Sequence, residues 1–317
     1  MKLVIQIPCF NEELTLPQTI RDLPIKIDGI DDIKYLVIDD GSSDRTIEVA
    51  RALGVNYILS FPNNRGLAMG FLAGIDYCLR LGADIIVNTD GDNQYKGRDI
   101  EKLIRPIMDG NAEIVVGARQ IDNIKHFTFI KKKLQKIGSW VVRLASNSNV
   151  VDTTSGFRAY SRDAAMRINV ISEYSYTLET IIDAGRKKTA IENVTIETNE
   201  KLRESRLYST IWSYLEKSAT TILRTYTMFK PLRVFFPLGV IVFSIGFFIG
   251  LRFLYLYAIG FGVGNIQSLI LASIMLTSGV QLIMFGFLAD AIAATRKIND
   301  EILYRIKKLE YEKDHQQ

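Results

Sequence analysis

Two aspartates one residue apart are the most informative chemical feature of the sequence. Asp90 and Asp92 stand in the segment NTDGDNQY, and Gln94 follows two residues later. Two carboxylates on one turn repel each other, and a divalent ion that bridges them to a diphosphate relieves this repulsion and neutralises charge on a leaving nucleotide. With only two histidines and two cysteines in the chain, a metal must be held mainly by oxygen atoms, which suits Mg²⁺ or Mn²⁺. The pair predicts such a site; a solvated acidic turn is the alternative.

Other polar segments also follow apolar runs. PCFNEE occupies residues 8–13, DDGSSD residues 39–44, and GAR residues 117–119. Each comes directly after a run that reads as a strand, so we expect these groups to gather along one edge of a sheet.

The elements that must position these residues are short buried strands. Apolar runs lie at residues 3–7, 35–38, 55–59, 84–88 and 113–117, with helical segments between them. This alternation predicts an α/β fold with a mostly parallel, Rossmann-like sheet flanked by helices, in which ligands bind at the carboxyl ends of the strands. No G-x-G-x-x-G follows the first strand, which argues against a dinucleotide fold.

The composition is ordinary for a soluble protein but hides a membrane segment. The net charge of +4 in 317 residues is too weak to indicate nucleic acid and is compatible with an anionic membrane surface. Residues 234–259 carry one charge and residues 266–289 none, and each stretch as a helix exceeds the roughly 30 Å hydrocarbon core. The short connector GFGVGN predicts a transmembrane hairpin, with a pair of buried core helices as the alternative.

Basic residues flank this hairpin on both sides. By the positive-inside rule they predict that the N-terminal domain and both termini lie in the cytoplasm, as parts of a two-span membrane protein. They are Lys230, Arg233, Arg296 and Lys297.

Taken together, PCFNEE, VIDDGSSDRT, NRGLAMGFLAG, NTDGDNQY, VVGAR and SGFRAYSR resemble the family-2 glycosyltransferases of GT-A fold. More narrowly, they are similar to the membrane-anchored polyprenyl-phosphate (dolichol-phosphate) glycosyltransferases over roughly residues 1–230. The resemblance implies a metal-dependent, inverting transfer of a sugar from a UDP- or GDP-linked donor to dolichyl or undecaprenyl phosphate at the cytoplasmic membrane face.

The resemblance also implies roles for single residues. The metal ligands would be Asp90, Asp92 and Gln94, and Arg119 would pair with a phosphate of donor or acceptor. The segment KLRESR at residues 201–206 resembles a basic loop that closes over the diphosphate. The expected donor-binding residues are Pro8, Phe10, Glu12, Val37, Asp39, Asp90, Gly91, Asp92, Arg119, Arg203 and Arg206.

The roles expected at the acceptor follow from the chemistry of the nucleophile. A lipid phosphate is already anionic near neutral pH, so catalysis rests on positioning and on neutralising the leaving group, with Asp92 and Arg119 as catalytic residues. Asp152 is a candidate base or acceptor-site group, and Arg158 a candidate acceptor-phosphate ligand; a buried pair that holds the loop is the alternative for both.

Two segments suit a membrane-surface acceptor. Residues 126–144 contain Lys131 and Lys132 among aromatic residues, and residues 208–229 are also rich in aromatic residues. A solvated charged face is the alternative for the lysines.

The expected organisation has four parts: a catalytic domain (1–207), interfacial helices (208–233), two membrane helices (234–289) and an amphipathic cytoplasmic helix (290–317). The expected partners are a nucleotide sugar, polyprenyl phosphate and membrane lipids, with no nucleic acid, and a homo-oligomer is compatible with the charged helical tail.

Three other functions are alternatives to this hypothesis. A processive family-2 synthase would need a Q-x-x-R-W motif and more spans. A sugar nucleotidyltransferase would need a Gly/Lys-rich first loop where this chain has PCFNEE. A non-catalytic membrane scaffold would not need the strand-end carboxylates to be intact.

Overall fold

The computed structural model describes residues 1–119, 142–143, 146, 148–170, 176–199, 220, 224, 227, 230–260 and 266–314. Contacts divide the chain into two compact units. One comprises Met1–Ile222 together with Leu303–Gln317, and the other comprises Leu223–Ile302. The C-terminal turns of the chain therefore belong to the same unit as the N-terminal α/β domain.

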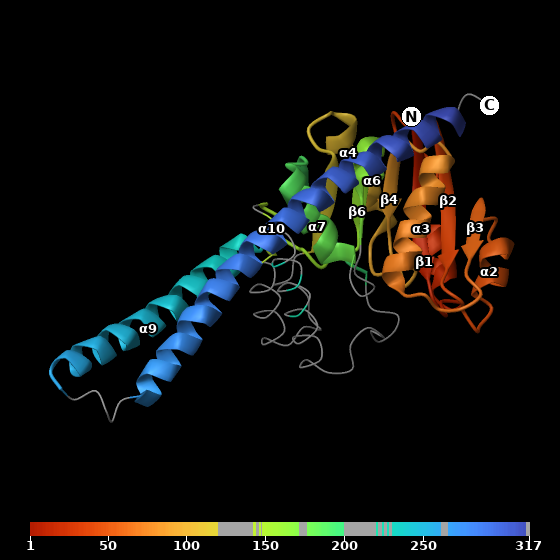
Figure 1. Cartoon of the computed structure of the whole chain (residues 1–317). Coiled ribbons are helices and arrows are strands. Elements are labelled where there is room, and N and C mark those ends of the chain that lie inside the picture. The colour runs from red at the N-terminus through yellow and green to blue at the C-terminus, as the bar shows by residue number, and fades with distance from the viewer. Residues whose placement is uncertain are drawn as a thin grey trace. The chain divides into compact units, whose positions relative to one another are not determined.

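A seven-stranded mixed sheet forms the centre of the first unit, in the order β3-β2-β1-β4-β6-β5-β7 (Figure 1). The strand pairs are parallel except where β6 runs antiparallel to both β4 and β5. The strands are β1 (Lys2–Cys9), β2 (Asp32–Asp39), β3 (Tyr57–Ser60), β4 (Ile85–Asn88), β5 (Ile114–Arg119), β6 (Arg158–Ser161) and β7 (Ile191–Ile196).

The predicted mostly parallel sheet is confirmed, and all five expected strands are present. The strands β6 and β7 were not expected from the sequence. β6 has four residues and begins with an arginine, and β7 has one buried residue, so neither gives a continuous apolar run.

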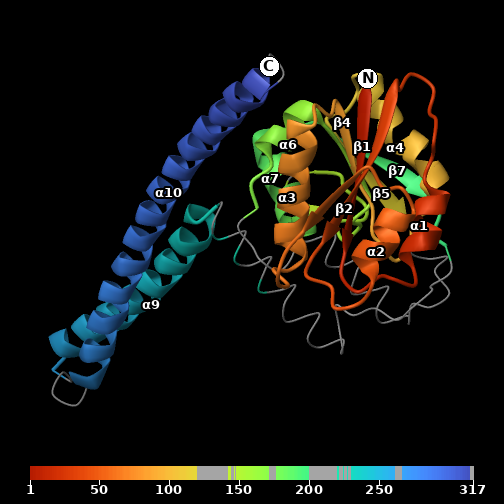
Figure 2. The same cartoon turned by 90° about the vertical axis from the view of Figure 1, so that its right-hand side faces the viewer.

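Helices cover both faces of this sheet. In Figure 2, α3 (Leu67–Arg80), α6 (Arg162–Arg167) and α7 (Tyr176–Lys187) lie on one side, and α1 (Leu16–Asp22) and α4 (Ile100–Met108) lie on the other. The remaining helices of this domain are α2 (Thr46–Ala52) and the 3-10 turn η1 (Gly97–Asp99).

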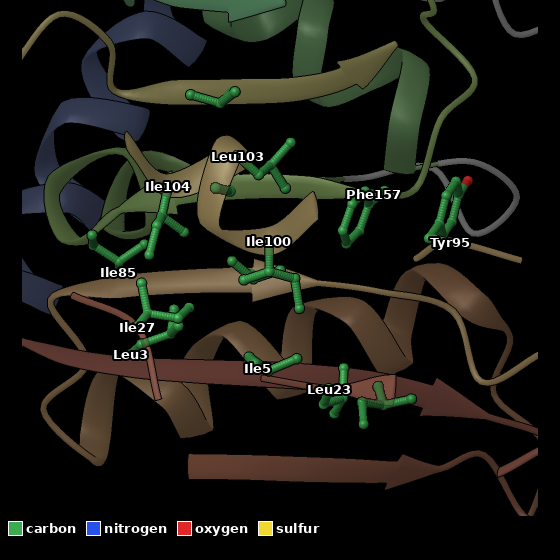
Figure 3. Packing of buried hydrophobic residues seen from close by; sticks show 14 of the residues in the cluster. Leu3, Ile5, Leu23, Ile27, Ile85, Tyr95, Ile100, Leu103, Ile104 and Phe157 are labelled. Carbon is green, nitrogen blue, oxygen red and sulfur yellow. The ribbon is translucent and has the colours of Figure 1, made fainter. Parts of the chain in front are cut away.

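Side-chain alternation sorts the strand residues between the two faces. Leu3, Ile5 and Ile7 of β1 pack with α4 and α1 in a large apolar cluster (Figure 3). On the other face, a Cβ added at Gly74 of α3 would lie 2.4 Å from Gln6 Oε1, so the helix rests directly on the sheet.

The second unit contains most of two long apolar helices, α9 (Leu232–Ala258) and α10 (Ile266–Asp314). Both are long and apolar enough to be candidate membrane spans. Glycines bring the two helices together: a Cβ at Gly239 would lie 2.7 Å from Ile283, one at Gly246 would lie 2.8 Å from Met275, and one at Gly279 would lie 2.6 Å from the nitrogen of Phe243.

The helix α10 runs without interruption from Ile266 to Asp314. The expected second span (266–289) and the expected amphipathic tail (290–317, described to residue 314) therefore lie on one helix. Its apolar first part and its charged last part differ in sequence, but no glycine or proline separates them to end the helix.

Candidate functional site

The loop that follows β1 is joined to the loop that follows β2. The backbone nitrogen of Asn11 donates to Ser42 Oγ at 2.8 Å, and Asn11 Oδ1 accepts from the Ser43 nitrogen at 2.8 Å. The nitrogen of Glu12 donates to Thr46 Oγ1 at 2.9 Å. Asn11 adopts a left-handed conformation (φ 55°), which asparagine tolerates better than most residues. Hydrogen bonds thus join the loops PCFNEE and DDGSSD at the carboxyl ends of β1 and β2.

Asp39, the last residue of β2, and Asp40, which follows it, accept different hydrogen bonds. Asp39 is nearly fully buried, and its carboxylate accepts from the Ser60 hydroxyl at 3.0 Å and from the Ser42 nitrogen. Asp40 accepts from the nitrogens of Arg65 and Gly66 at 2.7 and 2.9 Å. Asp40 therefore satisfies backbone donors at the start of α3, while Asp39 is held in place at the strand end.

The Asp90–Gln94 turn packs against the loop after β1. A Cβ at Gly91 would lie 2.8 Å from Cys9 Sγ and 3.4 Å from both Glu12 Cγ and the Pro8 carbonyl oxygen. The Gly91 carbonyl also accepts from Thr19 Oγ1 at 3.0 Å. This close approach brings the predicted donor residues and the predicted metal ligands to one place at the carboxyl ends of β1 and β4.

Oxygen donors concentrate on this turn. Asp92 and Gln94 are partly exposed, and Asp92 Oδ1 accepts from the Gln94 nitrogen at 3.1 Å. Asn93 Oδ1 is buried and has no hydrogen-bond partner among the described residues. Within the described part of the chain, no three His, Cys, Asp or Glu side chains are grouped to hold an ion, so a metal would also need amide or ligand oxygens. Such a donor set fits Mg²⁺ or Mn²⁺.

The glycine of SGFR lies against this turn. A Cβ at Gly156 would lie 3.1 Å from Asp90 Oδ1 and 3.0 Å from the Tyr176 hydroxyl. Asn88 Nδ2 donates to the Gly156 carbonyl at 2.8 Å and to Tyr176 Oη at 3.0 Å. Tyr95 Oη accepts from the Gly156 nitrogen at 3.2 Å, and its ring stacks on Phe157 (Figure 3). A side chain at position 156 would therefore require the Asp90 carboxylate or the Tyr176 hydroxyl to shift by a few tenths of an ångström.

Sequence reasoning missed this role of Gly156, as well as Asn88 and Tyr95. Asn88 reads as the last residue of an apolar run, and Tyr95 as an aromatic residue after the acidic turn. The one available signal was a buried amide at the end of a strand, which must find hydrogen-bond partners across the sheet.

Arg119 and Asp152 form a buried ion pair. Arg119 Nε and Nη2 donate to the two carboxylate oxygens of Asp152 at 2.6 and 3.0 Å, and Nη2 also donates to Thr154 Oγ1 at 2.9 Å. Burial by itself would raise the pKa of Asp152, but the Arg119 guanidinium and the hydrogen bonds around the carboxylate hold that pKa below its ordinary value. The structure therefore gives Asp152 the task of orienting Arg119.

Arg158, predicted as an acceptor-phosphate ligand with a loop-holding role as the alternative, makes hydrogen bonds within the protein. Its side chain is fully buried, and its guanidinium donates to the carbonyls of Ser155, Thr153 and Thr177 and to the Thr180 hydroxyl. These bonds hold the loop before β6 against α7. This arrangement fits the alternative that Arg158 holds the loop, and its contact with an acceptor phosphate stays a prediction.

The other predicted donor residues differ in exposure. Phe10 is exposed and Pro8 partly exposed, whereas Glu12 is buried and accepts from the Thr15 hydroxyl. The Val37 side chain is fully buried in the apolar cluster, and its contact with the donor stays a prediction. Lys131, Lys132, Arg203 and Arg206 lie outside the described residues.

Comparison with known proteins assigns this chain to a family. The family model described as "Glycosyl transferase family 2" matches residues 4–168. A UDP-N-acetylglucosamine–dolichyl-phosphate N-acetylglucosaminyltransferase of Methanococcus voltae is 31% identical over 217 residues, which cover 61% of this chain and 83% of that protein. A prophage bactoprenol glucosyl transferase homolog of Escherichia coli is 28% identical over 328 residues, which cover 97% of this chain and all of that protein.

Solved structures give the same fold. Glucosyl-3-phosphoglycerate synthase from Mycobacterium tuberculosis, in complex with Mn²⁺, UDP and glucosyl-3-phosphoglycerate, superposes with a TM-score of 0.56 at 18% identity. The match covers 71% of this chain and 78% of that one. This similarity establishes a shared fold and, at such low identity, nothing about substrates.

Proposed function

The chain belongs to glycosyltransferase family 2, and from this premise we propose that it transfers a sugar from a UDP- or GDP-linked nucleotide sugar to a polyprenyl phosphate. The observation that carries the proposal is the Asp90–Gln94 turn, which is packed on the loop after β1 and beside Gly156. The names of the two relatives, a dolichyl-phosphate and a bactoprenol glycosyltransferase, support the acceptor class.

Donor binding is assigned to the edge formed by β1, β2 and β4. Asp39, fixed by Ser60 and Ser42, accepts hydrogen bonds from the base or ribose, and the exposed ring of Phe10 contacts the nucleotide. Asp90, Asp92 and Gln94 would hold Mg²⁺ or Mn²⁺. When bound there, the ion would supply positive charge beside the diphosphate and make the nucleoside diphosphate a better leaving group.

The acceptor reacts as an anion. A lipid phosphate oxygen attacks the anomeric carbon, the bond to the diphosphate breaks, and the configuration at that carbon inverts. No proton must be removed from a phosphate that is already ionised, so Asp152, whose pKa is lowered beside Arg119, is not needed as a base. Arg119 is held by Asp152 and Thr154 with its guanidinium at the end of β5, where it pairs with a phosphate.

The reaction is assigned to the cytoplasmic face of the membrane. This rests on the basic residues around the hairpin, which include Lys230 and Arg233, and on the two candidate spans. Lys131 and Lys132 are assigned to the lipid surface on sequence grounds alone.

A donor-panel assay tests the proposal. Purified full-length protein in detergent receives labelled nucleotide sugars one at a time, polyprenyl phosphate, and Mg²⁺, Mn²⁺ or a chelator. We expect label in the lipid product with one donor and only with metal present. Asp92→Asn should lower the rate at least a hundredfold, since it removes one charge that holds the ion.

The control is Asp109→Asn, which changes an aspartate at the end of α4 away from the site and should leave the rate unchanged. Full activity of Asp92→Asn would contradict the metal assignment. Nucleotide-sugar binding that does not respond to Mn²⁺, with no transfer to lipid, would favour the non-catalytic scaffold.

A further inference from the structure

The last turns of α10 contact the α/β domain through two similar sets of side chains, each made of a tyrosine, an aspartate and an arginine. In the first copy, the Tyr304 hydroxyl donates to Asp163 Oδ1, and Arg167 Nε donates to Asp163 Oδ2 at 2.9 Å. The Arg167 guanidinium lies 3.7 Å from the centre of the Tyr304 ring. Tyrosine, aspartate and arginine thus form a closed set, with Asp163 and Arg167 one turn apart on α6.

The second copy has the same parts on α3. The Tyr311 hydroxyl donates to Asp76 Oδ1, Arg80 Nε donates to Asp76 Oδ2 at 3.0 Å, and the Arg80 guanidinium lies 5.7 Å from the Tyr311 ring centre. Arg80 also pairs with Glu310 at 2.7 Å. We call the surface formed by Asp76, Arg80, Asp163 and Arg167 the tyrosine dock.

The spacing of the two copies matches the geometry of one helix face. Tyr304 and Tyr311 are seven residues apart, or about two turns, so both point to the same side of α10. Lys307 lies between them and donates to the Ile168 carbonyl at 3.4 Å. Ile302 and Leu309 stand on the opposite side, with 49% and 63% of their surfaces exposed, whereas Tyr311 is 1% exposed.

The charges of this surface favour a tyrosine-bearing helix as its occupant. Each aspartate accepts one hydrogen bond from its arginine and keeps a second oxygen for a hydroxyl, while each arginine presents a flat cation to an aromatic face. Burial would raise the pKa of Asp163, but Tyr304 and Arg167 hold it below its ordinary value, so the acceptor stays ionised at neutral pH.

We propose that the tyrosine dock binds the C-terminal turns of its own chain and so links the catalytic unit to the membrane hairpin a second time. The chain leaves the catalytic unit after Ile222 and returns to it at Leu303, at the end of the helix that forms the second candidate span. A catalytic unit attached to the hairpin at one point can rotate freely, whereas attachment at two points restricts its rotation. This restriction raises the effective concentration of a membrane-bound substrate at the candidate site. This consequence rests on the proposed transfer to polyprenyl phosphate.

Cross-linking tests the docking itself. Full-length protein carrying Arg80→Cys and Glu310→Cys is treated in membranes with a short bis-maleimide; the native Cys9 and Cys78 are buried, and the Tyr304 contact is left intact. We expect an intrachain cross-link that keeps monomer mobility. The control pair, Arg80→Cys with Leu309→Cys, should react at least fivefold less. Absence of the cross-link, or a cross-link between two chains, would overturn the proposal.

Activity tests the consequence of docking. Tyr304→Ala with Tyr311→Ala should lower kcat/KM for a long-chain polyprenyl phosphate in vesicles at least tenfold, while a short, water-soluble polyprenyl phosphate is turned over within twofold of the wild-type rate. The matched control is Ile302→Ala with Leu309→Ala on the opposite side of α10. An unchanged ratio between the two acceptors would overturn the linking role. Failure of the wild-type protein to use either acceptor would instead contradict the proposed function, and the cross-link would then decide the docking alone.

Discussion

The pairing of Arg119 with Asp152 determines what each residue can do. The guanidinium is 8% exposed and the carboxylate 0%, so each charge depends on the other for compensation. A carboxylate held by two guanidinium nitrogens and the Thr154 hydroxyl is a weak proton acceptor. Sequence reasoning could single out Arg119 after a strand and Asp152 shortly before SGFR, but 33 positions separate them and only the fold shows that they are partners.

Replacing Asp152 by asparagine should therefore destabilise the protein and lower its activity. Loss of one partner of a buried pair costs about 3 kcal/mol, and a loosely held Arg119 should lower kcat at least tenfold with little change in the KM for donor. Chemical denaturation in detergent and steady-state kinetics measure the two effects. Asp32→Asn, at an exposed pair with Lys34, is the control and should cost less than about 1 kcal/mol. Wild-type stability in Asp152→Asn would contradict the role of the pair.

The same pair predicts a direction for the pH dependence of stability. The pKa of Asp152 is lower in the folded protein, so its contribution is fully present above the unfolded value of about 3.9 and is lost as the pH falls through the folded pKa. The difference in unfolding free energy between wild type and Asp152→Asn should be constant from about pH 5 to 7 and shrink below about pH 4. Denaturation curves at a series of pH values measure it, and a difference that grew on acidification would refute the assignment.

Gly156 gives a second test at the scale of one residue. Gly156→Ala puts a methyl group 3.1 Å from Asp90 Oδ1 and 3.0 Å from Tyr176 Oη, so the carboxylate or the loop must move by a few tenths of an ångström. We expect kcat to fall at least tenfold. The Mn²⁺ concentration that gives half-maximal activity should rise, which a titration with Mn²⁺ measures. Gly70→Ala is the control, because its Cβ meets only Ile38 at an ordinary 3.7 Å. Equal activity of both variants would show that Asp90 needs no such space.

At the scale of elements, the sequence is informative where burial is continuous. The strands β1 and β4 and the second half of β2 are buried and mostly apolar, and the polar groups that follow them form the candidate site. β6 could not be predicted, because it begins with Arg158 and its antiparallel position between β4 and β5 depends on pairings distant in the sequence. The burial of Val37 could not be assigned to one face for a related reason: a strand buried on both faces does not reveal which side chains point toward which helices.

The contact between α9 and α10 yields a prediction at this scale. A Cβ at Gly279 would lie 2.6 Å from the Phe243 nitrogen, which is backbone and cannot turn aside, so Gly279→Leu should force the helices apart. In a membrane such close packing is a main source of helix association. We expect a lower temperature of aggregation in detergent for this variant. Gly250→Ala, which meets only Ala272 Cβ at 3.8 Å, should behave as wild type, and an unaffected Gly279→Leu would argue against the glycine contact.

At the scale of the whole molecule, the tyrosine dock constrains membrane topology. Leu303–Gln317 and Met1–Ile222 form one compact unit, so, with α9 and α10 as the proposed spans, we expect the two segments on the same side of the membrane. The chain between them must then cross an even number of times, and α9 and α10 are two candidate spans. This requirement is independent of the positive-inside rule, from which we propose that the shared side is the cytoplasm.

Cysteine labelling in intact cells can separate these two statements. Gly262→Cys, in the connector between the helices, should react with a membrane-impermeant maleimide added outside, whereas Leu309→Cys, which is exposed on α10, should react only after the cells are opened. The unmodified chain is the control, since Cys9 and Cys78 are buried and should give little background. Reaction of Leu309→Cys alone from outside would reverse the orientation but preserve the even number of crossings. Reaction of both variants from outside would contradict the spans themselves, because the docked helix and the connector would then share one side.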